Sequence, residues 1–249
     1  MTFAILFFVA MWAGAQNALA GGGSFLTLPA LMFTGMDALA ANITSCVALF
    51  PAQIATGWTG RKFAVGAGGL SLRTLFLISI IGGVIGAGVL LLTPRGLFAQ
   101  LVPWLVLFAT AIFGWGSFIR KPGDAQGHAP APLVGLLQFL ISIYGGYFGG
   151  GIGFLMMAAL TMAGQDVRVA SATKNVLAGV MNASAVTIFL FSPDLHAPQA
   201  LITAAGATIG GVFGARLVQV IDPKILRVLV LLVGSALTIG LFLRAYSFL

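Results

Sequence analysis

Two glycine-led stretches of this chain carry residue types that could bind a small anion. Residues 21–45 read GGGSFLTLPALMFTGMDALAANITS, and residues 149–175 read GGGIGFLMMAALTMAGQDVRVASATKN. In both, a glycine cluster precedes a short apolar run, and a second glycine break leads into a segment with polar side chains. Glycine at the beginning of a helix lets an anion approach free backbone N–H groups at the positive end of the helix dipole. We therefore expect both glycine clusters to border one anion site.

Lys174 is the charged residue that best fits such a site. It lies seven or eight residues into an apolar span, where an ionised side chain is costly and is usually engaged. We interpret it as the cationic partner of the anion; the alternative is that its side chain extends back to the membrane surface. The predicted binding residues are the glycines and polar groups of both halves: Gly21, Gly22, Gly23, Asn42, Thr44, Ser45, Gln53, Gly149, Gly150, Gly151, Thr173, Lys174, Asn175 and Asn182.

Each of these residue types also has a purely structural interpretation. The glycines could serve only close helix packing, and Thr44 and Thr173 could bond back to the preceding helical turn. Asp37 and Asp166 follow glycine breaks and are better interpreted as N-caps of the next helices than as a proton relay. The first spans of the two halves contain three amides in all, Gln16 and Asn17 in the first half and Gln138 in the second, and these could either line the cavity or cap the turns beside it. The further glycine runs at 82–88 and 206–214 are most simply helix-packing faces.

The composition is that of a membrane protein. Hydrophobic residues make up 59% of the 249 residues and charged residues only 7%, whereas a soluble domain carries roughly 25% charged residues. Apolar runs of membrane-spanning length recur along the chain, so we expect an all-α, polytopic membrane protein in the lipid bilayer. The net charge of +7 comes from basic residues placed singly or in pairs between apolar spans, which indicates membrane topology and not nucleic-acid binding.

An internal repeat divides the chain into two halves. Aligning the sequence with itself at an offset of 129 residues pairs the two glycine-led stretches, and at an offset of 128 residues GGVIGA at 82–87 pairs with GGVFGA at 210–215. We predict a first transmembrane repeat at 1–119, a polar cytoplasmic linker at 120–132 and a second repeat at 133–249. The paired positions include Gly22/Gly151, Phe25/Phe154, Leu31/Leu160, Gly35/Gly164, Asp37/Asp166, Thr44/Thr173 and Pro94/Pro223.

Each repeat is expected to contain four full spans and one short, broken helix. The short helices, at 25–35 and 154–164, would be only ~16 Å long, about half a bilayer. Glycine-rich backbone must complete each of these crossings, and it is tolerated at membrane depth only when it is buried in protein or lines a wet cavity. The full spans are predicted at 2–20, 38–59, 71–93 and 97–119 in the first repeat, and at 133–148, 167–191, 199–220 and 225–246 in the second.

The basic residues predict the orientation of the chain. If every element crosses the membrane once and the N-terminus is outside, nine basic residues lie on the cytoplasmic side and only Arg95 and Arg244 lie outside. Five crossings per repeat is an odd number, so the second repeat would enter the membrane inverted, as in many secondary transporters. The cytoplasmic set is Arg61, Lys62, Arg73, Arg120, Lys121, Arg168, Arg216, Lys224 and Arg227.

Several kinds of chemistry are missing from the sequence. The chain has no glutamate, a single cysteine, no Walker lysine motif and no plausible pairing of a nucleophile with a base. We therefore expect neither an enzyme nor a cofactor or metal site. A coupling ion, Na⁺ or H⁺, is possible but is not identified by the sequence, and neither is a homo-oligomeric state.

The paired motif resembles the signature of the TauE/SafE family, whose members are regarded as sulfite exporters or toluene-sulfonate uptake permeases. The glycine cluster, the apolar run, the glycine break and the Ala-x-x-Thr-Ser/Asn segment occur in both halves. The second copy departs from the pattern, because Ala158 stands where the first copy has Pro29. The resemblance covers nearly the whole chain and implies transport of sulfur oxyanions, sulfonates or related organic acids across a prokaryotic inner membrane.

The leading hypothesis is therefore a secondary transporter that moves a small anion by alternating access. The anion would bind near the membrane midplane, between the two glycine breaks. Two other functions are also compatible with the sequence: a passive anion channel, and a membrane assembly or anchoring protein that transports nothing.

Overall fold

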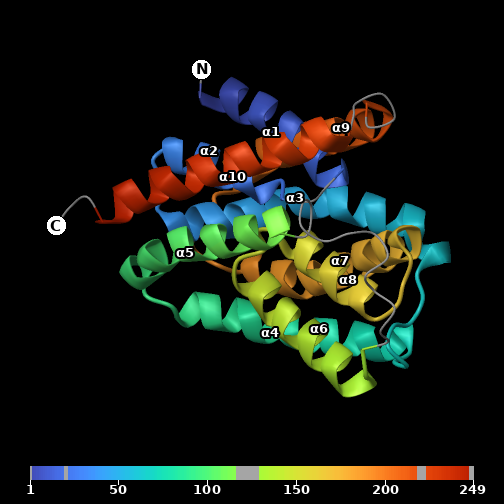
Figure 1. Ribbon diagram of the computed structural model, residues 1–249. Helices are drawn as coiled ribbons and strands as arrows, with labels where there is room; N and C mark the ends of the chain where they lie inside the picture. The colour runs from blue at the N-terminus through green and yellow to red at the C-terminus, as the bar shows by residue number, and fades with distance from the viewer. Residues whose placement is uncertain (1, 20–21, 116–128, 218–222, 247–249) are drawn as a thin grey trace.

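The structure is a computed structural model that describes residues 2–19, 22–115, 129–217 and 223–246, and all its regular elements are helical. Figure 1 shows the long helices running roughly side by side, with α1, α9 and α10 above α3 and with α4 and α6 below it. The elements are α1 (Thr2–Leu19), α2 (Ser24–Phe33), α3 (Ala38–Gly60), the 3₁₀ turn η1 (Arg61–Phe63), α4 (Leu72–Leu92), α5 (Arg95–Gly114), α6 (Ala131–Tyr147), α7 (Ile152–Met162), α8 (Val167–Phe189), α9 (Ala197–Leu217) and α10 (Pro223–Tyr246).

Three of the described helices are long and apolar enough to cross a membrane by length and composition. They contain the segments Ala38–Ala55, Leu72–Leu92 and Arg95–Gly114, and shorter apolar helices make up most of the rest. The observed helices follow the predicted spans closely. Several helix ends within the described residues are shifted by two residues from the predicted bounds. Helix α6, for example, begins at Ala131, because Pro132 suits the first helical turn, and so the helix starts inside the predicted linker. Linker residues 120–128 lie outside the described residues.

Both short helices are present, and glycines in the left-handed region bound them. Helix α2 has 10 residues and α7 has 11, so at 1.5 Å per residue each spans only ~15–17 Å. Positive φ angles at Gly22 (82°) and Gly151 (75°) begin the two helices, and Gly35 (95°) and Gly164 (89°) end them. Side chains with a Cβ are strained at such angles, which explains why glycine stands at the same place in both halves.

The outer glycine runs pack helices of different halves against one another. In α4, a Cβ added to Gly83 or Gly86 would collide with backbone atoms of α8 or α6, and one added to Gly206 or Gly210 of α9 would collide with the backbone of α1. The packing prediction for these runs is confirmed at these positions. The first helix of each half thus packs on the fourth helix of the other half, so the two halves are interleaved.

Two pairs of helices that correspond to each other in the two halves are in contact, and the members of each pair run in opposite directions. In the pair formed by α3 and α8, Gly60 faces Ala172 near one end and Gln53 bonds Asn182 further along. In the pair formed by α5 and α10, Trp104 contacts Phe242, whereas a side chain at Gly114 would contact Leu231. Each pair is therefore antiparallel. Helix α1 begins and α10 ends at the same end of the bundle, on the left in Figure 1.

Acidic side chains stabilise the turns at the two ends of the bundle. The Asp37 carboxylate accepts bonds from the backbone N–H groups of Leu39 and Ala40, and the Asp166 carboxylate accepts from those of Arg168 and Val169. Both aspartates are N-caps, as predicted.

Candidate functional site

The two glycine breaks meet in the interior of the bundle. A Cβ added to Gly22 would lie 3.5 Å from the Phe154 ring, and one added to Gly151 would lie 3.4 Å from the Phe25 ring. Phe25 and Phe154 occupy corresponding positions in the two halves, so each break is covered by the aromatic ring of the other half's short helix. The beginnings of α2 and α7 are therefore neighbours.

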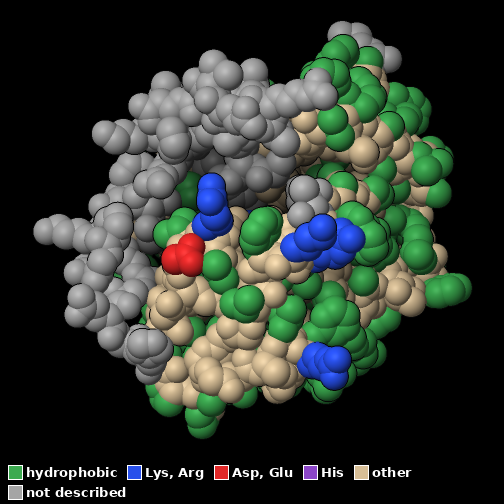
Figure 2. Space-filling model, turned by 90° about the vertical axis from the view of Figure 1, so that its right-hand side faces the viewer, with side chains coloured by type: hydrophobic (Ala, Val, Ile, Leu, Met, Phe, Trp, Pro, Cys, Tyr) green, Lys and Arg blue, Asp and Glu red, His purple; other side chains and the backbone are tan. Residues whose placement is uncertain are grey.

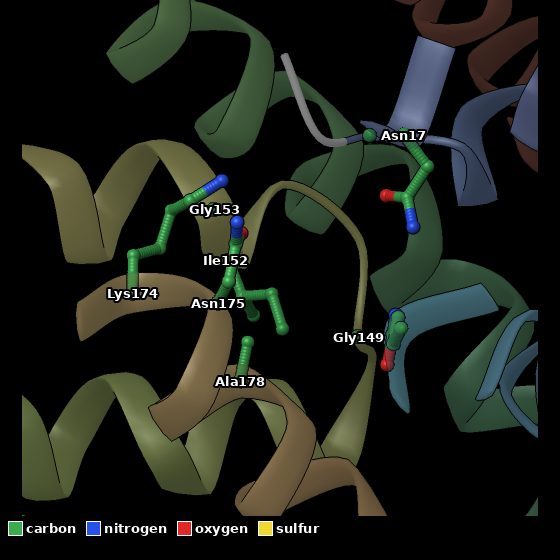
Figure 3. A pocket seen from close by; sticks show the side chains of 9 residues that line it. Asn17, Gly149, Ile152, Gly153, Lys174, Asn175 and Ala178 are labelled. Atoms are coloured by element: carbon green, nitrogen blue, oxygen red, sulfur yellow. The ribbon is translucent and has the colours of Figure 1, made fainter. Parts of the chain in front are cut away.

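A small pocket lies where the breaks meet. Its cavity volume is about 40 Å³. A single water needs ~10–15 Å³ by the same kind of measure, so the pocket has room for about three waters or one small anion. Figure 3 shows Asn17 approaching it from α1 and Lys174 and Asn175 from α8. The lining residues are Asn17, Gly22, Gln53, Gly149, Ile152, Gly153, Lys174, Asn175 and Ala178.

Lys174 supplies the positive charge of this pocket. The residue is only 8% exposed, and its side chain extends from α8 toward the beginning of α7, near Gly153 (Figure 3). Within the described part of the chain, no hydrogen bond or ion pair reaches its ammonium group, although a buried charge without a partner is costly. The pocket is therefore suited to an anion that would supply the missing partner.

The helix beginnings add backbone donors to the same place. Ile152 and Gly153 form the first turn of α7, where backbone N–H groups have no acceptor within the helix. Across the pocket, Asn17 Oδ1 accepts a long bond of 3.5 Å from the backbone N–H of Gly23. No residue that lines the pocket is acidic. One ammonium and the positive ends of two helices give it a positive potential, and two asparagine side chains add neutral amide groups.

Gln53 and Asn182 join the two halves beside the pocket. Asn182 Nδ2 donates to Gln53 Oε1 at 2.5 Å, and these residues occupy corresponding positions in α3 and α8. Gln53 also lines the pocket. Asn182 therefore acts on the site through Gln53, and it does not itself line the cavity.

Of the predicted residues, Gly22, Gln53, Gly149, Lys174 and Asn175 line the pocket. The glycines Gly23, Gly150 and Gly151 are buried next to it, and Gly21 lies outside the described residues.

Four other predicted residues bind elsewhere in the protein. Thr44 accepts a bond from the backbone N–H of His196, and Thr173 accepts one from that of Val65. Asn42 donates to the Tyr147 carbonyl. The Ser45 and Thr27 hydroxyls bond each other at 2.5 Å. Their side chains tie helices and turns together, and none of the four lines the pocket.

The three amides whose role the sequence did not decide, lining the cavity or capping a turn, have different roles in the structure. Asn17 both lines the pocket and bonds the first break, and Gln16 Nε2 donates to the Gly22 carbonyl at 3.5 Å. Gln138 instead donates to Ser79 of α4 and to Ser142 of its own helix, α6. Ala178 was not predicted as a lining residue, although it follows Lys174 by one helical turn and so shares its face of α8.

Comparison with known proteins gives a consistent result. Residues 6–241 match the protein-family model described as "Sulfite exporter TauE/SafE". The chain is 31% identical to a "Probable membrane transporter protein ORF9" of Sinorhizobium sp over 96% of this chain and 91% of that protein. It is 30% identical to a "Probable membrane transporter protein" of Haemophilus influenzae, over 94% and 92% of the two chains, and 26% identical to the "Probable membrane transporter protein YfcA" of Escherichia coli, over 98% and 90%.

Proposed function

Since this chain belongs to the sulfite exporter TauE/SafE family of membrane transporters, we propose that it is a secondary transporter of a small anion. The substrate is a sulfite-like sulfur oxyanion, an organosulfonate or a related organic acid, and the membrane is the inner membrane of a prokaryotic cell. The protein takes part in no chemical conversion of the anion. Its role is to bind the anion in the bundle interior and release it on the other side.

One observation carries this proposal: Lys174 is only 8% exposed as a residue, its ammonium has no bonding partner among the described residues, and it lines the pocket between the two glycine breaks. An anion held there would pair with the ammonium and accept bonds from Asn175 and from the first N–H groups of α7. The same arrangement would disfavour cations, because no carboxylate lines the pocket to offset the positive charge.

The size of the pocket favours a small oxyanion. A cavity of about 40 Å³ fits a group that replaces about three waters, such as sulfite or the sulfonate end of a larger molecule. Larger organic acids require the remainder of the molecule to extend out of the pocket. Among the proposed substrates, sulfite is therefore the first to test.

Alternating access is the proposed mechanism, and the paired packing of the helices supports it. Antiparallel contacts between α3 and α8, and between α5 and α10, are what two inverted-topology repeats would produce. Helix α1 packs on α9, and α4 packs on α6. Movement of one of these packed pairs against the other would therefore change access to the pocket from both ends of the bundle together. The pocket would then open to one side at a time.

Transport of labelled sulfite into proteoliposomes tests the proposal. We expect uptake that saturates with concentration and is accelerated by unlabelled sulfite inside, because a carrier exchanges bound substrate across the membrane. Lys174→Met is expected to abolish this uptake. Lys62→Met is the control, since Lys62 is exposed in η1 and lies outside the pocket.

The outcomes separate the proposed transporter from the two other functions. Uptake that rises linearly and shows no exchange would identify a passive channel. Absence of uptake for sulfite, sulfate, thiosulfate, taurine, sulfoacetate and short carboxylates would favour a protein without transport activity. If Lys174→Met took up sulfite at the wild-type rate, Lys174 would not be part of the binding site.

A further inference from the structure

A second, much larger cavity lies next to the pocket. Its cavity volume is about 1070 Å³, and α1, α3, α8 and α9 line it. It lies toward the end of the bundle where α3 ends and α8 begins, because Gly60, Phe63 and Arg168 all border it. We refer to this cavity as the vestibule. Figure 2 looks onto that end of the molecule, where Lys and Arg side chains stand apart among hydrophobic ones.

Asn17 and Asn175 lie between the two cavities. Both residues line the small pocket and also the vestibule, and they come from α1 and α8 on opposite sides. Both are half-buried, so each can contact the pocket and the wider space at once. An anion that moved from the vestibule to Lys174 would therefore pass between these two amides.

One face of α8 leads from the surface to this point. Arg168, Ser171 and Asn175 border the vestibule at spacings of three and four residues, which places them on one side of the helix. Lys174 and Ala178 continue the path within the pocket. At 1.5 Å per residue, the distance along α8 from Arg168 to Lys174 is only ~9 Å.

Arg168 is suited to collecting anions at the mouth of the vestibule. Its side chain is exposed, and its guanidinium forms no ion pair with any described residue. Nearby, the Asp166 carboxylate is engaged as the N-cap of α8. A free positive charge at the entrance of a low-dielectric cavity raises the local anion concentration within about one Debye length, ~8–10 Å.

We propose that the vestibule is the route by which anions reach the pocket from the end of the bundle that carries Arg168, which we call the basic face. Arg168 binds the anion at the mouth of the vestibule. Asn17 and Asn175 form a selective polar constriction between the vestibule and Lys174, which we call the threshold. This inference rests on the proposed function. Its test, however, measures access to the cavity by chemical labelling and needs no transport.

Single cysteines placed along the route provide the test. In a Cys46→Ser background, Ser171→Cys reports on the vestibule and Ala178→Cys on the pocket, and each is exposed to methanethiosulfonates that carry either a sulfonate or a trimethylammonium group. We expect Ser171→Cys to react from the basic face and several-fold faster with the anionic reagent. Adding Arg168→Gln should abolish that preference, whereas Arg73→Gln, an exposed arginine that does not line the vestibule, should preserve it.

The threshold is tested separately. Asn17→Leu should slow labelling of Ala178→Cys at least tenfold and leave labelling of Ser171→Cys unchanged. Gly96→Cys controls for sidedness, because a Cβ there meets open space and the residue adjoins Arg95 at the other end of the bundle. If Ser171→Cys misfolds, Ala172→Cys also lines the vestibule and takes its place.

Labelling of Ser171→Cys from the face of Gly96, or an anion preference that survives Arg168→Gln, would overturn the route. Equal labelling of Ala178→Cys with and without Asn17→Leu would overturn the threshold. Failure of the proposed function would appear differently, as absence of uptake together with a labelling pattern that follows the route. Uptake that depends on Lys174 but is unrelated to the labelling pattern would support the proposed transporter and contradict the vestibule route.

Discussion

At the scale of single residues, Lys174 is the feature that most needs an explanation. A buried ammonium without a protein partner lowers stability, and an unsatisfied buried polar group typically costs about 1–3 kcal/mol. Such a residue persists where its cost is offset by a function, and here the pocket around it has no acidic lining residue, which fits the proposed anion site. The charge and the neighbouring N–H groups act together only when an anion is bound.

This account predicts that Lys174→Met does not destabilise the protein when no anion is present. Methionine is apolar and similar in length, so the unfolding free energy should stay the same or rise by about 1–3 kcal/mol. Thermal or denaturant unfolding of the purified protein in an anion-poor buffer measures this change. A large loss of stability would mean that Lys174 has a structural partner, and it would contradict the site.

Some of the residues that the sequence analysis singled out line the pocket, and the reason is clear. Lys174 and the glycines stood out because charge and backbone freedom are exceptional in an apolar span. Ser45 and Thr44 carry equally polar groups, but which partner a hydroxyl finds depends on packing, and here Thr27 and the backbone of His196 are the partners. Asn17 could not be placed from its type alone, because an amide can line a cavity or bond a turn, and it does both.

At the scale of the elements, short broken helices and glycine contacts set the shape of the interior. The sequence predicted both short helices because glycine clusters interrupt an apolar run at corresponding places in the two halves. It also predicted the packing role of the outer glycine runs. It did not indicate which helix each run would face, since contacts between α1 and α9 or between α4 and α6 join segments far apart in the chain.

Two glycines of α4 offer a matched test of helix packing. A Cβ on Gly86 would meet the backbone N of Tyr147 at 2.8 Å and the backbone carbon of Gly146 at 3.0 Å, whereas one on Gly88 meets nothing within 4 Å. Gly86→Ala is therefore expected to lower the unfolding temperature by several degrees, because α4 and α6 must move apart. Gly88→Ala should leave it unchanged or raise it. Equal behaviour of the two variants in the same unfolding assay would contradict the observed contact.

At the scale of the whole molecule, the two ends of the bundle differ. The vestibule is open at the end with Arg168, whereas at the opposite end Arg95 bonds the carboxylates of both Asp37 and Asp194. This ion-pair cluster joins the turns before α3, α5 and α9. In the proposed alternating-access cycle, this cluster would belong to the closed face.

Breaking this cluster should shift the protein toward the state that is open at the other end. Exposed ion pairs contribute only about 0–1 kcal/mol each, so Arg95→Gln should change the balance by no more than a few-fold. We expect Ser171→Cys, in the Cys46→Ser background, to be labelled more slowly when Arg95→Gln is added, because the vestibule is closed for more of the time. Faster or unchanged labelling would show that the cluster does not hold this face closed.

The central claim is that Lys174 and the two glycine breaks bind a small anion, and a binding titration tests it most directly. The unfolding temperature of the purified wild type and of Lys174→Met is followed against increasing sulfite, sulfate, thiosulfate, taurine, sulfoacetate and short carboxylates, with and without Na⁺. Because a ligand that binds only the folded state stabilises it, the wild type should gain stability with at least one of these anions, and Lys174→Met should not. Equal stabilisation of both proteins, or of neither by any anion, would contradict the claim.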